Sequence, residues 1–193
     1  MRILMLGNSF TSANELPRHL SLLTGAEVVA HTRGGARLAE QMNQKTKLGA
    51  RTRAALKEER WDYVILQEMS NGPITSPERF LESVQKICTV IRQNKAVPVL
   101  YGTWAYQEGG KKLEAMGMTY EEMSRQMSAQ YHRAAIENGA LLADVGQRFL
   151  EYEASRDLYA PDGVHPNQKG TEIAAGTLAE VILKDAVGKS RPV

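Results

Sequence analysis

Two short segments far apart in the sequence carry residues that could act together in catalysis. Ser9 lies in the segment Gly-Asn-Ser-Phe-Thr (residues 7–11), directly after an apolar run, and His165 follows Asp162 by three residues. A serine hydroxyl is a weak nucleophile at neutral pH unless a base accepts its proton and a third group orients that base. The pattern predicts Ser9 as nucleophile, His165 as base and Asp162 as the orienting carboxylate.

His165 is favoured as the base over the other histidines of the chain. Those other histidines are His19, His31 and His132. Only His165 has a carboxylate three residues before it, and it lies between Pro161 and Pro166, which stiffen the segment. Taken alone, each candidate has a simpler explanation, because serines often cap helices and aspartates often form turns. The interpretation as a catalytic unit rests on the occurrence of all three residues together.

The composition is that of one globular domain with an ordinary charge balance. The 193 residues include 24 basic and 22 acidic side chains, for a net charge of +2, and 42% are hydrophobic. This balance gives no basis for binding nucleic acid or an anionic membrane. The first apolar run is too short for a signal peptide, and no stretch approaches a membrane span, so we expect a cytoplasmic protein. The single cysteine, Cys88, has apolar neighbours at helical spacing and is interpreted as a core residue.

Short apolar runs alternate with helical patterns along the whole chain. Strands are predicted at 3–6, 26–31, 63–66, 96–101 and 141–145. Helices are predicted at 16–23, 38–59, 77–93, 119–138 and 167–187, the fourth with a capping box at Thr119 and a stop at Gly139. This alternation predicts a single α/β domain over 1–187, a doubly wound, flavodoxin-like three-layer α/β/α sandwich with a five-stranded parallel sheet. Residues 188–193 are predicted to be a flexible tail, and 104–117 a mobile loop.

In a doubly wound sheet, reactive groups gather where the parallel strands end. Several residues that could contact a substrate lie just after a predicted strand. They are Ser9 after the first strand, Gly34 and Gly35 after the second, Gln67, Glu68 and Asn71 after the third, and Trp104 after the fourth. We therefore expect these residues to lie near one edge of the sheet.

The serine segment near the amino end and Asp162-x-x-His165-Pro166 near the carboxyl end together resemble the SGNH (GDSL-like) hydrolase family. The resemblance covers almost the whole chain. It implies that Ser9 is the nucleophile, His165 the base and Asp162 its orienter. It also implies an oxyanion hole formed by the Ser9 amide, a glycine amide after the second strand and an asparagine side chain after the third.

The family's glycine and asparagine are assigned from their places in the chain. Gly35 immediately precedes the next helix and is favoured over Gly34. A gapless placement of the third strand gives Asn71, with Gln67 as an alternative amide donor. The chain departs from the family's Gly-x-Asn-Asp pattern on both sides of Asn71, and an asparagine precedes Ser9 where the family has aspartate. These departures are typical of a divergent branch of the family.

Two further side chains could bind the substrate. Glu68 could contact a polar group of the substrate, or it could be a structural acid that pairs with Arg33 or Arg37. Trp104 could line a pocket for a sugar ring or an acyl chain, or it could pack in the core.

The resemblance implies hydrolysis of a small-acyl ester, for example an acetate, through an acyl-enzyme on Ser9. A carbohydrate O-acetyl group is one candidate substrate by family analogy. No cofactor is expected, and the sequence contains no phosphate loop, dinucleotide fingerprint or zinc-ligand spacing. Two alternatives stay open, a non-catalytic domain that binds a glycan or acyl ligand, and an acyltransferase in which a second alcohol replaces water. The sequence leaves the oligomeric state open.

Overall fold

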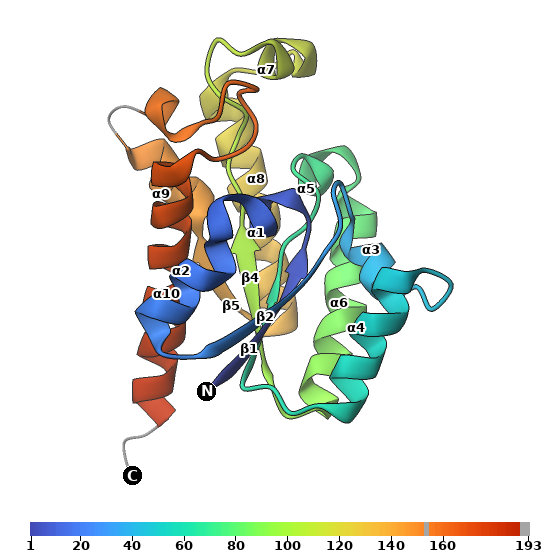
Figure 1. Cartoon of the computed structure of the whole chain (residues 1–193). Coiled ribbons are helices and arrows are strands. Elements are labelled where there is room, and N and C mark those ends of the chain that lie inside the picture. Colours follow the sequence, from blue (N-terminus) through green and yellow to red (C-terminus); the bar gives the residue numbers. More distant parts are fainter. Residues whose placement is uncertain (153–154, 190–193) are drawn as a thin grey trace.

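A five-stranded parallel sheet forms the centre of the protein. The structure is a computed structural model that describes residues 1–152 and 155–189, and the strand order is β2-β1-β3-β4-β5 (Figure 1). The strands are β1 (Arg2–Gly7), β2 (Glu27–Thr32), β3 (Tyr63–Leu66), β4 (Val97–Gly102) and β5 (Leu141–Asp144). The chain winds outward from β1 to β2 and then from β3 to β5, so the winding reverses between β1 and β3. Ligands of doubly wound folds bind at the carboxyl ends of the strands at such a reversal.

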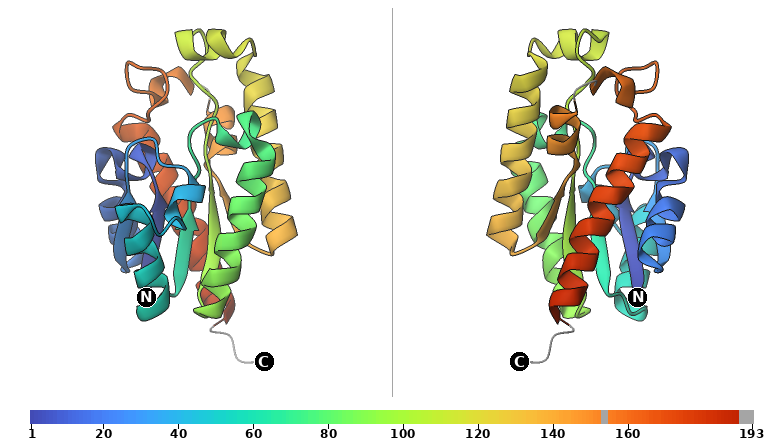
Figure 2. Two further views of the ribbon diagram at one scale, coloured as in Figure 1. Left: turned by 90° about the vertical axis from the view of Figure 1, so that its right-hand side faces the viewer. Right: turned by 90° about the vertical axis from the view of Figure 1, so that its left-hand side faces the viewer.

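Helices cover both faces of this sheet (Figure 2). They are α1 (Ser9–Ser12), α2 (Leu16–Thr24), α3 (Leu38–Gln41), α4 (Lys47–Glu58), α5 (Gly72–Thr75), α6 (Pro77–Gln93), α7 (Lys111–Met116), α8 (Tyr120–Asn138), α9 (Val145–Glu151) and α10 (Gln168–Lys189). Two short 3-10 helices lie at Ala13–Glu15, after α1, and at Ser155–Leu158, after α9. Helices α2 and α10 pack together on one face, and α4, α6 and α8 lie on the other. This arrangement confirms the predicted fold class.

The core lies on both faces of the sheet. The whole of 3–6 in β1 and 64–66 in β3 is fully buried, as expected for central parallel strands. Cys88 is buried within α6, and burial raises the pKa of its thiol to about 11. Across the described residues, no helix is both long enough and apolar enough to cross a membrane.

The predicted helix at 38–59 is wrong, because the structure divides it into α3 and α4. Between them the side chain of Asn43 accepts a hydrogen bond from the Lys45 amide (3.0 Å). Thr46 then caps α4 by accepting from the Gly49 amide (3.0 Å). Such side-chain acceptors compete with helical hydrogen bonds and end the helix locally. Residues 43–47 are polar and contain neither glycine nor proline, so no helix breaker marked this turn in the sequence.

Other segments also differ from their predicted structure, and the short helices α5 and α9 were not predicted. The predicted loop at 104–117 contains the helix α7, and it begins with the buried side chain of Trp104. Helix α10 continues to Lys189, two residues into the predicted tail. The rest of that predicted tail, 190–193, lies outside the described residues.

A buried polar network joins three elements to the carboxyl end of β1. The ring Nδ1 of His31 lies 3.1 Å from Oγ1 of Thr52, and the Thr52 hydroxyl donates to Oε1 of Gln41 (2.7 Å). Since that hydroxyl has one proton, His31 donates from Nδ1. The amide of Gln41 donates in turn to the carbonyls of Gly7 (3.3 Å) and His31 (3.1 Å). The network therefore fixes the strand end that leads into Ser9.

His31 predicts how the stability of the protein depends on pH. Burial, aided by the charge of Arg51, lowers the pKa of His31 from 6.5 to about 4. Because the folded pKa is depressed, the stabilisation is fully present above the unfolded pKa and is lost as the pH falls through the folded value. We predict that the free energy of unfolding falls between pH 6.5 and 4, with His31 contributing at most about 3 kcal/mol. Urea denaturation at several pH values measures it.

The variant His31→Gln cannot titrate, so its free energy of unfolding should fall less steeply over this range. The comparison concerns the slope with pH, and a constant loss of stability in the variant does not affect it. Equal slopes for the two proteins would show that protonation of His31 does not destabilise the fold.

Candidate active site

Ser9 is the first residue of α1, directly beyond the carboxyl end of β1 (Figure 1). Asn8 is the N-cap of this helix, and its side chain accepts a hydrogen bond from the Phe10 amide (3.0 Å). The same side chain donates to the carbonyl of Ala36 (3.1 Å), while the backbone amide of Asn8 donates to Oε1 of Gln67 (2.9 Å). Contacts from two neighbouring loops therefore hold the turn that presents Ser9.

Gly7 occupies a position where a side chain does not fit. A Cβ atom there would lie 2.6 Å from Oε1 of Gln67 and still closer to Oγ1 of Thr11. These two oxygens are 3.0 Å apart and hydrogen bonded, so neither can move away freely. Glycine before Asn8 is therefore a packing requirement of the turn.

Ser9, His165 and Asp162 form one continuous chain of hydrogen bonds. Nε2 of His165 lies 2.8 Å from Oγ of Ser9, and Nδ1 lies 2.5 Å from Oδ2 of Asp162. The other carboxylate oxygen, Oδ1, accepts from the backbone amides of His165 (2.9 Å) and Val164 (3.0 Å). A proton on Nδ1 facing Asp162 leaves Nε2 free to accept the proton of Ser9. The structure thus brings together the three side chains that the sequence predicted to act as a unit.

The carboxylate of Asp162 is held in its ionised form. Burial opposes ionisation, but the hydrogen bonds from the His165 side chain and from the amides of His165 and Val164 outweigh it. Together they lower the pKa of Asp162 below its usual value. A carboxylate that stays charged stabilises the imidazolium that forms when His165 accepts a proton.

An aromatic stack supports the loop that carries His165. Trp104 lies between Phe10 and Phe149, with ring centroids 4.8 and 4.3 Å from its own. Its Nε1 donates to the Val164 carbonyl (3.0 Å). The rings of His165 and Phe10 pack nearly perpendicular to each other, with their centroids 5.3 Å apart. Trp104 is 1% exposed, so of its two predicted roles the structure gives it the core position and not contact with substrate. Trp104 supports the site indirectly, because its hydrogen bond to the Val164 carbonyl holds the loop of His165.

Glu68 is also enclosed by protein, which assigns it the structural one of its two predicted roles. It is 2% exposed, and its carboxylate accepts hydrogen bonds from the backbone amides of Leu38 (3.2 Å) and Met69 (2.8 Å). Of the two predicted partners, Arg33 pairs with Glu40 on the surface instead (2.8 Å), and Arg37 stabilises the Glu68 carboxylate through its charge. A carboxylate with these contacts is not placed to touch a substrate.

The predicted oxyanion donors lie on loops at the carboxyl ends of neighbouring strands. Gly35 follows β2 with a φ of 66°, in the left-handed region that favours glycine, whereas Gly34 has no such requirement. Asn71 follows β3 at the start of α5, and its side-chain amide donates to Sδ of Met116 in α7 (3.6 Å). The amide of Asn71 therefore faces the segment that follows β4.

Gln67, the alternative amide donor, has both ends of its side chain engaged. Oε1 accepts from the Asn8 amide and the Thr11 hydroxyl, and Nε2 donates to the carbonyl of Glu68. The residue is 1% exposed. The structure therefore places Gln67 as a support for the Ser9 turn, a role that sequence reasoning missed because its partners include a backbone amide 59 residues away.

The segment around α7 bridges the loops on either side of the site (Figure 1). The hydroxyls of Tyr106 and Ser70 lie 3.0 Å apart, which ties the segment to the loop after β3. The amide of Gln107 donates to the carbonyl of Gly163 (2.8 Å), which ties it to the loop that carries His165. The chain after β4 thus links the loop that carries Asn71 to the loop that carries His165.

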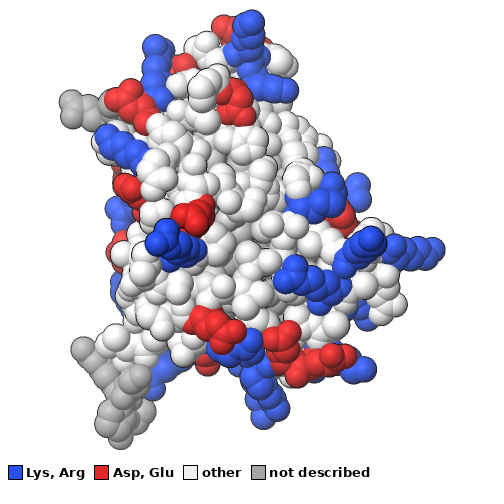
Figure 3. All heavy atoms as spheres, viewed as in Figure 1, with Lys and Arg blue, Asp and Glu red and all other residues white. Residues whose placement is uncertain are grey.

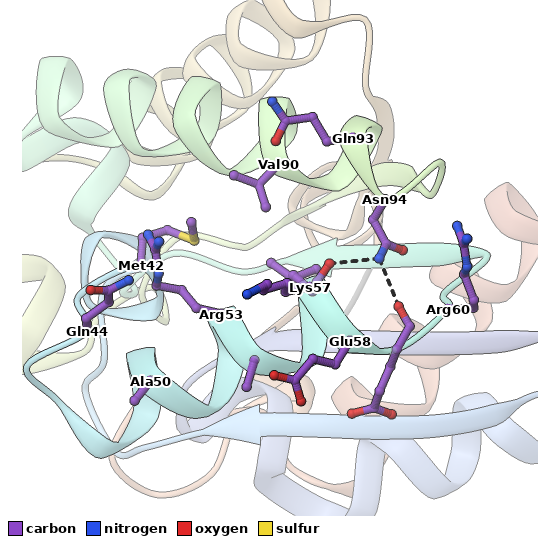
Figure 4. A pocket seen from close by; sticks show the side chains of 13 residues that line it. Met42, Gln44, Ala50, Arg53, Lys57, Glu58, Arg60, Val90, Gln93 and Asn94 are labelled. Atoms are coloured by element: carbon purple, nitrogen blue, oxygen red, sulfur yellow. Dashed lines mark hydrogen bonds between the residues drawn. The ribbon is translucent and has the colours of Figure 1, made fainter.

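A large surface hollow lies away from these residues. A cavity of about 880 Å³ lies beside α4 and α6 and includes Arg53, Lys57 and Asn94 (Figure 4). None of Ser9, Asp162 and His165 lines it. The hydrogen bonds drawn there hold Asn94 to the carbonyls of neighbouring backbone (2.7 and 2.8 Å). Cavity size therefore does not locate the candidate site, whereas the hydrogen-bond geometry does.

Comparison with known proteins agrees with this geometry. Residues 5–173 match the model of the GDSL-like lipase/acylhydrolase family, so the chain belongs to this family. A protein from Slackia heliotrinireducens assigned to the SGNH hydrolases is 50% identical, with a TM-score of 0.91 over 94% of this chain and 98% of that chain. The predicted resemblance to SGNH hydrolases is confirmed, and membership implies hydrolysis of ester bonds. No curated protein sequence matches the chain.

Two more distant structures share the fold alone. A DUF4886 family protein from Bacteroides uniformis has a TM-score of 0.70 and 18% identity, over 100% of this chain and 86% of that chain. The acetyl xylan esterase AlAXEase has a TM-score of 0.65 and 15% identity, over 94% of this chain and 100% of that chain.

The packing around Gly7 gives a prediction about stability. We expect Gly7→Ala to lower the free energy of unfolding by about 1–3 kcal/mol, because the added Cβ overlaps Gln67 and Thr11. Gly176→Ala is a matched control, since nothing lies within 4 Å of a Cβ at that helical position. The control should be neutral or more stable by up to about 1 kcal/mol. Equal free energies of unfolding for the two variants in urea would contradict the packing argument.

Proposed function

We propose that the protein is a carboxylic ester hydrolase that removes a small acyl group through an acyl-enzyme on Ser9. The observation that carries this proposal is the hydrogen-bonded chain from Ser9 Oγ to His165 Nε2 (2.8 Å) and from His165 Nδ1 to Asp162 (2.5 Å). Membership of the GDSL-like lipase/acylhydrolase family supports the same reaction class.

In the first half of the proposed reaction, Oγ of Ser9 attacks the ester carbonyl carbon while Nε2 of His165 accepts its proton. The carbonyl π electrons move onto oxygen, which gives a tetrahedral oxyanion. Asp162 stabilises the imidazolium through the proton on Nδ1. The bond to the alcohol then breaks, and the leaving oxygen takes the proton from Nε2, which leaves the acyl group on Ser9.

In the second half, water replaces the alcohol. His165 accepts a proton from the water as its oxygen attacks the acyl carbon, and the second oxyanion collapses to release the acid and restore the Ser9 hydroxyl. In both halves the amides of Ser9 and Gly35 and the side chain of Asn71 are the proposed donors to the oxyanion. Gly34 is the alternative to Gly35.

Two observations support a small uncharged ester as substrate. Uncharged side chains cover much of the middle of the face shown in Figure 3, with an acidic and a basic side chain to their left and several Lys and Arg side chains to their right, and α1 lies near the middle of that view. The proposed donor Asn71 also has an apolar neighbour, since its side-chain amide lies 3.6 Å from the thioether of Met116. The narrower candidate is a carbohydrate O-acetyl group, supported by a likeness of fold to an acetyl xylan esterase.

Labelling with a fluorophosphonate probe tests whether Ser9 is activated. We predict one adduct per chain, located on Ser9 by peptide mass spectrometry, with no adduct in Ser9→Ala and labelling reduced to background in His165→Ala. The reason is that only a serine whose proton passes to a base attacks phosphorus at an appreciable rate. A folded wild-type protein that does not react would favour the alternative of a domain that binds a glycan or acyl ligand.

Substitution of Asn71 tests the proposed oxyanion hole. We expect Asn71→Ala to lower kcat for an aryl acetate by about 10²–10³-fold, with KM little changed, because the amide would bind the oxyanion and not the substrate ground state. Asn94→Ala is the matched control, since Asn94 lies in the distant hollow of Figure 4 and should keep its kcat. Equal activity of Asn71→Ala and wild type would remove Asn71 from the mechanism.

A further inference from the structure

We infer that Glu68 is a positioning residue whose buried carboxylate ties the loop of Gly35 to the loop of Asn71, and so holds two proposed oxyanion donors at a fixed separation. The inference rests on the proposed function. It gives Glu68 an indirect part in the reaction, because its carboxylate is buried and contacts backbone groups.

The two oxygens of Glu68 bind two different loops. Oε2 accepts from the amide of Leu38 (3.2 Å), the first residue of α3, which follows Gly35 by three positions. Oε1 accepts from the amide of Met69 (2.8 Å), two positions before Asn71. One side chain therefore spans from the loop after β2 to the loop after β3, across the end of β1.

The packing leaves the carboxylate little freedom. Glu68 is 2% exposed, and a Cβ placed on Gly72 would lie 2.9 Å from Cγ of Glu68. Gly72 directly follows Asn71, so the backbone of the Asn71 loop lies against the Glu68 side chain. A shift of Glu68 would therefore move that loop.

The charge of Glu68 suits this role. Burial raises the pKa of Glu68, while the amides of Met69 and Leu38 and the charges of Arg37 and Arg79 favour its ionised form. An ionised carboxylate accepts hydrogen bonds at both oxygens, whereas a carboxamide has one acceptor and one donor group. An amide at this position would leave one backbone N–H facing another N–H group and would lose that hydrogen bond.

Gln67 and Glu68 divide the support of the site between them. Gln67 binds the Asn8 amide and so holds the turn of Ser9, while Glu68 holds the loops of Gly35 and Asn71. Consecutive residues that leave a strand point in opposite directions, which lets adjacent side chains reach different loops. Both residues follow β3, next to the reversal of the sheet winding.

The test is a double-mutant cycle on hydrolysis of an aryl acetate. We expect Glu68→Gln to lower kcat by about 10–100-fold with KM within about two-fold, since loosening a donor costs less than removing it. In the Asn71→Ala background the same substitution should cost less, because one of the two donors that it positions is already gone. Full additivity of the two losses would overturn the inference, as would an unchanged kcat in Glu68→Gln.

Asp185→Asn is the matched control for the change from acid to amide. Asp185 accepts a hydrogen bond from the Tyr63 hydroxyl (2.8 Å) at the amino end of β3, the end of the strand away from Ser9. Loss of the Asp185 carboxylate should therefore leave kcat unchanged. If wild type itself shows no Ser9-dependent hydrolysis, the proposed function fails before Glu68 is tested. The two failures are therefore distinguishable.

A second pair of variants keeps the inference testable if Glu68→Gln does not fold. Leu38→Pro removes the N–H that donates to Glu68, and Arg37 before it is already extended (φ −96°, ψ 156°), as a following proline requires. Leu38→Ala loses the same side-chain packing but keeps the N–H. We expect kcat of the proline variant to be about 10-fold below that of the alanine variant. Equal kcat values would overturn the inference.

Discussion

The contact between Ser9 Oγ and His165 Nε2 is the constraint on which the rest of the site depends. The two residues are 156 positions apart, and their atoms lie 2.8 Å apart. Hydrogen bonds weaken steeply with distance and angle, so both loops must be fixed to within a fraction of an ångström. On the serine side Gln67 fixes the turn, and on the histidine side Asp162 and the contact from Trp104 to the Val164 carbonyl do the same.

Much of this fixing is done by buried polar side chains that bind backbone groups. Three buried side chains bind backbone groups at the ends of strands or the starts of helices, namely those of Gln41, Gln67 and Glu68. A buried polar group costs stability unless its hydrogen bonds are complete, and these residues have their partners. Such fully bonded groups make the loops rigid, which a preorganised oxyanion hole requires.

The sequence predicted the sheet, the longer helices α2, α6, α8 and α10, and the residues that come together around Ser9, because these features carry local signals. Strands appear as apolar runs, and the serine and histidine segments are marked by glycine and proline turns. The roles of Gln67 and Glu68 could not be predicted, since their partners are backbone amides of distant loops, which any residue can supply. The break between α3 and α4 was missed because the polar residues 43–47 include neither glycine nor proline to mark a turn. The position of Trp104 depended on Phe10 and Phe149, which only the fold brings together.

The central claim is that Ser9 carries the acyl group during turnover, and trapping that intermediate tests it most directly. The protein would be mixed with an aryl acetate, quenched in acid during the first turnovers and digested for mass spectrometry. We predict an acetyl group on the peptide that contains Ser9, formed in a burst with the released phenol. Steady hydrolysis without acetylated Ser9 under these conditions, or an acetyl group that accumulates on another residue instead, would contradict it.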